Sequence, residues 1–145
     1  MATLPRVSIN TDMSAGMCFG CGQNNPIGLK LDFEWDGKTA RTEFTPNKLY
    51  QGWLGVVHGG ILACMLDEAM SYAARFEGNH CLTTQIEIKF RHPAPVEEPL
   101  VVTSSVTRHT RKLIDTMAQV SLKDGTVVAE ARAKHFVIGV KSNDA

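Results

Sequence analysis

Hydrophobic and polar positions along the chain predict one long helix, preceded by two strands and followed by four. The helix begins near Gly60, where a glycine pair leads into an apolar run without proline, and it ends between Phe76 and Gly78. The strands alternate apolar and polar side chains, which is typical of sheets with one buried face. They are predicted at residues 29–35, 38–45, 82–90, 100–108, 112–123 and 126–140. This order favours the α+β class, with the helix laid across an antiparallel sheet.

Turn signals and chain length set the predicted boundaries of the folded unit. Residues 17–29 are rich in Gly, Asn and Pro and therefore favour turns, and the stretch before them is polar. With 145 residues, the chain is long enough for one domain with a substantial core. We predict a flexible segment over residues 1–16, a folded domain over 17–140 and a flexible tail over 141–145.

Composition narrows the class of protein. Fifteen basic residues balance fifteen acidic ones, so no excess charge points to nucleic acid or to a membrane surface. No apolar run reaches the roughly 20 residues that a membrane span needs, and the first residues lack the pattern of a secretory signal. Four cysteines are too few for a disulfide scaffold. We therefore expect a cytoplasmic protein that acts neither on nucleic acid nor in a membrane.

The predicted helix carries one polar residue that needs an explanation. The helix is apolar or small on every side, which is typical of a buried helix. Asp67 projects from the middle of the side that holds the small residues. A buried carboxylate is costly without a partner, so either Asp67 is bonded to a neighbouring strand or cap, or it does chemistry.

The motif His58-Gly59-Gly60, with Asp67 downstream on the helix, resembles that of the hotdog-fold acyl-CoA thioesterases, a family that includes the phenylacetate-pathway enzymes. The resemblance extends from Cys18 to about Phe136. It implies an antiparallel β-sheet wrapped around one long central α-helix. It also implies acyl-CoA as the substrate and a homo-oligomer, either a dimer or a dimer of dimers.

Thioester hydrolysis assigns roles to these residues. The reaction needs donors for the developing oxyanion, and either an activated water or a nucleophile. N–H groups at a helix N-terminus bind anions, and Gly59 and Gly60 let a carbonyl approach that backbone without a Cβ in the way. Asp67 then acts as general base or as nucleophile, two roles that the sequence does not separate. His58 either orients the carbonyl or the water, or supports the loop.

Four further residues are candidates for substrate binding. The family places an amide side chain shortly before the glycine pair; Gln51 lies near that place, although Gly52 occupies the aligned position. A hydroxyl early in the strand after the helix often completes such sites, and either Thr83 or Thr84 could supply it, or serve only the sheet. Glu68 lies about 100° around the helix from Asp67, as a partner or rim residue.

Helix geometry predicts that the active site is shared between two subunits. Gly60 and Asp67 are separated by roughly 10 Å along a helix axis, too far to act on one carbon atom. Two such helices, antiparallel about a two-fold axis, can each offer the N-terminus to the other's Asp67.

Cys18 and Cys21 have the spacing of half a zinc or redox site. A complete site needs two more ligands, and the sequence contains neither a second Cys-x-x-Cys nor an adjacent pair of histidines. We therefore favour a tight glycine-containing turn over a zinc site, and we expect an enzyme that uses no metal and no redox cofactor.

The sequence therefore predicts an acyl-CoA thioesterase, which releases a carboxylic acid and free CoA. Two alternatives are a hotdog dehydratase or hydratase that acts on acyl thioesters, and a non-catalytic module that binds acyl-CoA. Dehydratase sites usually pair a catalytic His with an acid and lack a glycine pair next to the His. Release of free thiol from acyl-CoA separates the three.

Overall fold

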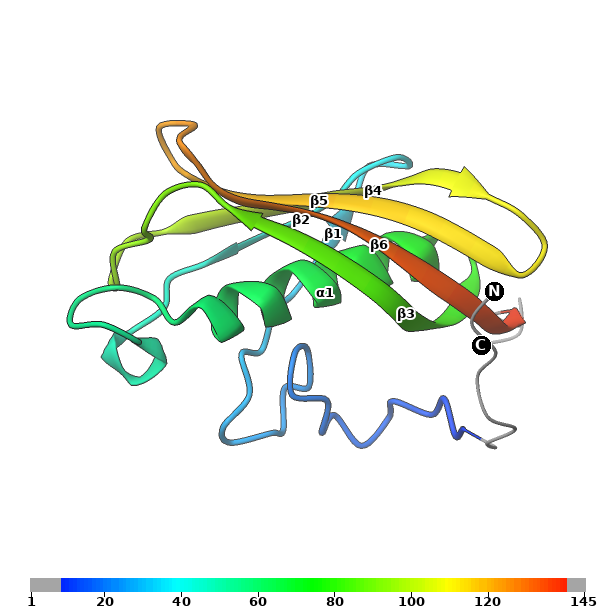
Figure 1. Cartoon of the computed structure of the whole chain (residues 1–145). Helices are drawn as coiled ribbons and strands as arrows, with labels where there is room; N and C mark the ends of the chain where they lie inside the picture. The colour runs from blue at the N-terminus through cyan, green and yellow to red at the C-terminus, as the bar shows by residue number, and fades with distance from the viewer. Residues whose placement is uncertain (1–8, 141–145) are drawn as a thin grey trace.

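One helix, α1 (Gly59–Phe76), lies across the concave face of a six-stranded antiparallel sheet (Figure 1). The computed structural model describes residues 9–140. The predicted tail, and residues 1–8 of the predicted N-terminal segment, lie outside the described residues. The helix begins and ends where the sequence predicts, and the prediction of an α+β protein whose sheet wraps around one central helix is confirmed.

The sheet has the strand order β1-β2-β4-β5-β6-β3, and every neighbouring pair is antiparallel. The chain therefore leaves the sheet after β2, the second strand from one edge, crosses the face of the sheet as α1, and forms the opposite edge as β3, which pairs with the last strand. The strands are β1 (Glu34–Trp35), β2 (Ala40–Phe44), β3 (Asn79–Phe90), β4 (Leu100–His109), β5 (Leu113–Leu122) and β6 (Val127–Val140).

Apolar side chains between α1 and the sheet form the core. Met65, Leu66 and Met70 on the helix are fully buried, as are Leu100 and Val102 on β4. Burial of one such side chain contributes about 1.5–3 kcal/mol to stability, so this layer holds the helix in a fixed position. Between residues 9 and 140, no helix combines the length and apolar composition that crossing a membrane would require.

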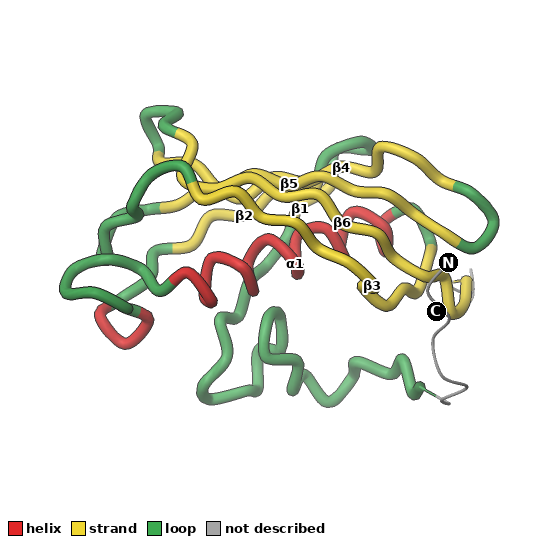
Figure 2. The backbone as a smooth tube through the Cα atoms, in the orientation of Figure 1, coloured by secondary structure: helices red, strands yellow, loops and turns green. Residues whose placement is uncertain are grey.

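A segment without regular structure covers the side of α1 that faces away from the sheet (Figure 2). Aromatic stacking joins this segment to the helix, with ring centroids 4.8 Å apart between Phe33 and Tyr72. A second stack of the same kind pairs Trp35 with Phe76 at 5.2 Å. Because α1 is covered from both sides, its apolar composition all round is explained.

The prediction of a strand over residues 29–35 is wrong for most of its length, since only Glu34 and Trp35 pair with β2. Leu29, Leu31 and Phe33 are buried, as their alternation requires. Their backbone bonds, however, go to the preceding turn: the N–H of Leu29 donates to the carbonyl of Phe19, and that of Leu31 to Gly20, each at 2.9 Å. Alternation reports which side chains are buried and does not identify the backbone partner.

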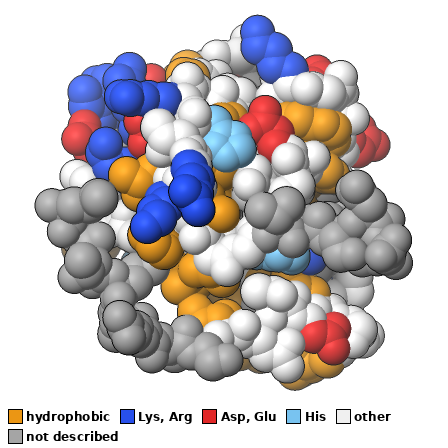
Figure 3. Space-filling model, turned by 90° about the vertical axis from the view of Figure 1, so that its right-hand side faces the viewer, with side chains coloured by type: hydrophobic (Ala, Val, Ile, Leu, Met, Phe, Trp, Pro, Cys, Tyr) orange, Lys and Arg blue, Asp and Glu red, His pale blue; other side chains and the backbone are white. Residues whose placement is uncertain are grey.

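The end of the molecule that holds the C-terminus of α1 and the turn between β4 and β5 is shown in Figure 3. Lys and Arg side chains gather there beside exposed hydrophobic side chains. The β4–β5 turn and its flanks carry three exposed basic residues, Arg108, Arg111 and Lys112.

Candidate active site

Asp67 lies half-buried in the middle of α1, facing the edge strand β3. The hydroxyl of Thr83 on β3 donates to Asp67 Oδ1, with 2.8 Å between the oxygens. The sequence left open whether Asp67 bonds to a neighbouring strand or takes part in catalysis. This hydrogen bond shows that Asp67 does bond to a neighbouring strand.

The hydrogen-bond chain continues from Thr83 into the sheet. Nδ1 of His135 on β6 lies 3.3 Å from Thr83 Oγ1, and its Nε2 lies 2.8 Å from Oγ1 of Thr116 on β5. The single hydroxyl hydrogen of Thr83 goes to the carboxylate, so Thr83 must accept from Nδ1–H of His135. In the neutral ring, Nε2 is then the acceptor for Thr116. Each hydrogen in the chain Thr116–His135–Thr83–Asp67 therefore points toward Asp67.

Burial of His135 favours the neutral ring, in which Nε2 accepts from Thr116; in a protonated imidazole Nε2–H would donate to Thr116 and reverse that bond. The side chain is fully buried. Burial lowers the pKa of His135, while the charge of Asp67 acts in the opposite direction with a smaller effect. The lowered pKa therefore agrees with a neutral His135 ring and with hydrogen bonds that all donate toward Asp67.

The second oxygen of Asp67, Oδ2, is the reactive candidate. It makes no hydrogen bond to any residue that the structure describes. Every buried side-chain nitrogen or oxygen in the described part of the chain has a partner, so Oδ2 is not sealed from solvent. One carboxylate oxygen is fixed by Thr83, and the other can accept a proton from water or attack a carbon atom.

A β-bulge decides which threonine reaches Asp67. Thr83 is opposite His135 on β6, and the next paired residue is Gln85, opposite Lys134, so Thr84 is the extra residue. A bulge re-aims the side chains around it. The hydroxyl of Thr84 donates to the carbonyl of Lys134 at 3.1 Å and makes no bond to Asp67.

His58 caps the N-terminus of α1. Its Nδ1 accepts from the N–H of Gly60 at 2.8 Å, so in the neutral ring the proton is on Nε2. The ring lies so close that a Cβ on Gly60 would be 3.0 Å from it, so a larger residue there would displace the capping ring. Of the two predicted oxyanion donors, only Gly59 has an N–H without an acceptor among residues 9–140.

The side chains of the other two predicted substrate-binding residues, Gln51 and Glu68, have partners other than Asp67. Oε1 of Gln51 accepts from the N–H of Gly55 at 3.1 Å and holds the loop before the helix. Glu68 points toward the turn at Cys18, whose Sγ lies 3.7 Å from Glu68 Oε1. Burial raises the pKa of the Glu68 carboxyl, and it raises that of the Cys21 thiol to about 12.

Within one chain, the helix N-terminus and Asp67 do not meet. Eight residues separate Gly59 from Asp67, about 12 Å along the axis. Beside Gly59 lies an open pocket lined by Gly52, Trp53, Val57 and His58. The large side chains next to it are exposed, with 86% of Trp53 and 91% of Leu54 accessible.

His135, which belongs to the hydrogen-bond chain that ends at Asp67, was not among the residues predicted from the sequence. The residues of β6 that are buried on its inner face are Ala129, Ala131, Ala133 and His135. A histidine in an alternating series of buried alanines is the signal that could have identified it, because a buried polar side chain needs a partner.

The model of the thioesterase superfamily matches residues 54–129, which include His58, Asp67 and Thr83. The chain is 36% identical over 59 residues to acyl-coenzyme A thioesterase THEM5 from Homo sapiens. That match covers 41% of this chain but only 24% of the human protein, so it spans about a quarter of the curated relative.

Solved structures share the fold. Protein RHA08564, a thioesterase superfamily protein, is 27% identical, with a TM-score of 0.79 over 92% of this chain and 68% of that one. The PaaI protein from the phenylacetic acid degradation operon of E. coli is 23% identical, with a TM-score of 0.73 over 78% of this chain and 83% of that one. These similarities identify the arrangement of sheet and helix as the hotdog fold.

Proposed function

Because the chain belongs to the thioesterase superfamily, we propose that it hydrolyses acyl-CoA thioesters to a carboxylic acid and free CoA. The single observation that carries the proposal is the state of Asp67, with one oxygen fixed by Thr83 and the other accessible. The similarity to a human acyl-coenzyme A thioesterase supports acyl-CoA as the substrate class.

In the proposed mechanism, the thioester carbonyl binds at the N-terminus of α1. The N–H of Gly59 donates to the carbonyl oxygen, where the helix dipole favours negative charge. The Nε2–H of His58, which caps the same helix, offers a second donor. Both stabilise the oxyanion that forms when the acyl carbon becomes tetrahedral.

Asp67 supplies the other half of the reaction. As a general base, Oδ2 takes a proton from water while the water oxygen bonds to the acyl carbon. As a nucleophile, Oδ2 bonds to that carbon itself, and water later cleaves the resulting anhydride. In both routes the C–S bond breaks and CoA leaves as a thiolate that takes up a proton.

Thr83 and His135 are positioning residues in this proposal. The bond from Thr83 fixes the rotamer of Asp67, and His135 fixes the direction in which Thr83 donates. Because His135 is neutral and fully buried, it adds no charge that would compete for the Asp67 carboxylate.

We further propose that two subunits share each site. The separation of Gly59 from Asp67 along one helix supports this arrangement. Exposed Trp53 and Leu54 beside the helix N-terminus provide an apolar surface that a second copy of the chain could cover. Two antiparallel helices about a two-fold axis then place Gly59 of each subunit near Asp67 of the other.

The test is the release of free thiol from acyl-CoA substrates of different chain lengths and aryl groups. A thioesterase releases thiol in proportion to time. A hotdog dehydratase would change the absorbance of an enoyl thioester without releasing thiol, and a binding module would retain acyl-CoA unchanged. Absence of thiol release across the panel, from folded protein, would refute the proposal.

A further inference from the structure

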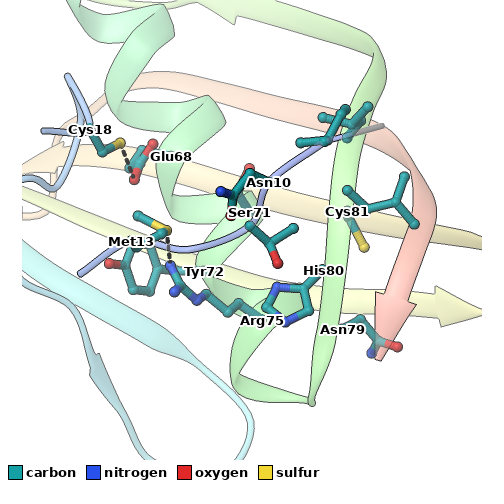
Figure 4. Close-up of a pocket in the computed structure, with 14 residues that line it drawn as sticks. Asn10, Met13, Cys18, Glu68, Ser71, Tyr72, Arg75, Asn79, His80 and Cys81 are labelled. Atoms are coloured by element: carbon teal, nitrogen blue, oxygen red, sulfur yellow. Dashed lines mark hydrogen bonds between the residues drawn. The ribbon is translucent and has the colours of Figure 1, made fainter. Parts of the chain in front are cut away.

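The turn before the first strand brings two thiols to the carboxylate of Glu68. Cys18, Cys21 and Glu68 each offer one ligand atom, and these atoms all lie within 4.8 Å of one another. The side chains of Cys18 and Glu68 point toward each other in Figure 4, with Sγ 3.7 Å from Oε1. The third group comes from α1, fifty residues after Cys18, which is why the Cys-x-x-Cys motif looked incomplete in the sequence.

Two glycines of this turn allow its groups to approach closely. The N–H of Gly22 donates to the carbonyl of Cys18 at 2.8 Å and closes the turn. A Cβ on Gly22 would overlap the backbone of Cys18. A Cβ on Gly20 would be 2.5 Å from the carboxyl carbon of Glu68. Glycine at these two positions therefore lets both thiols and the carboxylate converge.

We propose that Cys18, Cys21 and Glu68 bind one zinc ion. Two thiolates and one carboxylate are a ligand set that suits zinc, which is borderline-soft and prefers four tetrahedral ligands. Metals that prefer only oxygen ligands, such as magnesium and calcium, are disfavoured by the two sulfur atoms.

Water supplies the fourth ligand in this proposal. Cys18 and Glu68 border an open pocket of about 240 Å³, which is also lined by residues of the N-terminal segment, of α1 and of the start of β3 (Figure 4). That volume exceeds what one water molecule needs. The ion is therefore bound by three side chains on one side and is open to the pocket on the other.

The proposed ion would connect the irregular N-terminal segment to the central helix. Glu68 follows Asp67 directly, so zinc would tie the turn at Cys18–Cys21 to the helical turn that carries the candidate catalytic residue. The proposal does not depend on thioesterase activity, because it rests on the three ligands alone.

The experiment measures zinc in the full-length protein purified under reducing conditions. We expect one zinc per chain by mass spectrometry of the metal, and a thiolate-to-metal charge-transfer band when cobalt replaces zinc. Glu68→Gln and Cys18→Ser should each lower the affinity for zinc at least about ten-fold, since even changes around a zinc ligand have such effects. Cys81→Ser is the matched control, because it removes a half-buried thiol outside the trio and should keep full zinc content.

A chelator tests the zinc site in wild-type protein, so the result does not depend on how well the variants fold. Wild-type protein should lose thermal stability when the chelator removes zinc, and the Glu68→Gln variant should respond much less. The proposal is overturned if reduced wild-type protein binds no zinc and no cobalt. It is equally overturned if Cys81→Ser loses the metal as completely as Cys18→Ser does.

Discussion

Replacement of Thr83 by valine isolates the hydrogen bond that positions Asp67. Valine has nearly the shape of threonine and suits a strand. Thr83→Val therefore removes the hydroxyl that donates to Asp67 Oδ1 at 2.8 Å and leaves the packing of β3 in place. The bulge provides a matched control, because Thr84→Val removes a hydroxyl from the next residue, where it donates only to the Lys134 carbonyl.

The size of the effect follows from the charge of the acceptor. A hydrogen bond to a charged group contributes about 1.5–3 kcal/mol. If all of this free energy serves to hold the carboxylate in its reactive position, kcat falls about ten-fold to a hundred-fold in Thr83→Val. The same change leaves the Nδ1–H of fully buried His135 without an acceptor, at a cost of about 1–3 kcal/mol of stability.

The assay is thiol release at saturating acyl-CoA, with urea unfolding of the same preparations. We expect Thr83→Val to be slower and less stable than Thr84→Val, and Thr83→Ser to recover most of the rate because serine keeps the hydroxyl. If Thr83→Val is folded and hydrolyses acyl-CoA as fast as Thr84→Val, the bond from Thr83 does not position Asp67, and the role proposed for Thr83 and His135 is wrong.

Three further predictions concern the rest of the site. Asp67→Asn keeps the shape of the side chain and should lower turnover by about 10²-fold or more; a folded variant with near-full activity would make Asp67 structural. Gly59→Pro removes the N–H at a first-turn position where proline is tolerated, and this variant should be inactive. Mixing it with Asp67→Asn under subunit exchange should restore activity. If both variants fold and exchange subunits but the mixture stays inactive, the site is not shared. Burial lowers the pKa of His135 in the folded state, so the free energy of unfolding should be constant above about pH 6.5 and fall as pH drops below it, by up to about 1.4 kcal/mol per unit. His135→Gln should flatten that dependence in urea titrations, and an unchanged slope would show that another group is responsible.

Periodicity predicted most of the fold, because a helix and a half-buried strand each repeat at a fixed interval. The bounds of α1 were correct to about one residue. The prediction was wrong for residues 29–33, where alternation correctly indicated buried side chains but the backbone bonds the preceding turn instead of a strand.

The site was predictable only where chemistry is local in sequence. His58 and Gly60 are close neighbours, and the structure joins them as cap and helix N-terminus. Thr83 could not be chosen over Thr84 because a bulge breaks the alternation. The approach of Glu68 to Cys18 depends on the path of the chain between them, which no motif records.

The strand order has a consequence for biosynthesis. On the ribosome, α1 is complete before β3 to β6 exist, although its apolar residues need β4 and β5 to be covered. Chains are extended at about 5–20 residues per second, so several seconds pass between synthesis of the helix and synthesis of the strands that cover it. The edge strand β3 stays unpaired until β6, the last strand and its only partner in the sheet, has been synthesised. A chain that stalls before β6 would therefore expose both the helix and an unpaired strand edge, and would be a substrate for chaperones or a source of aggregates.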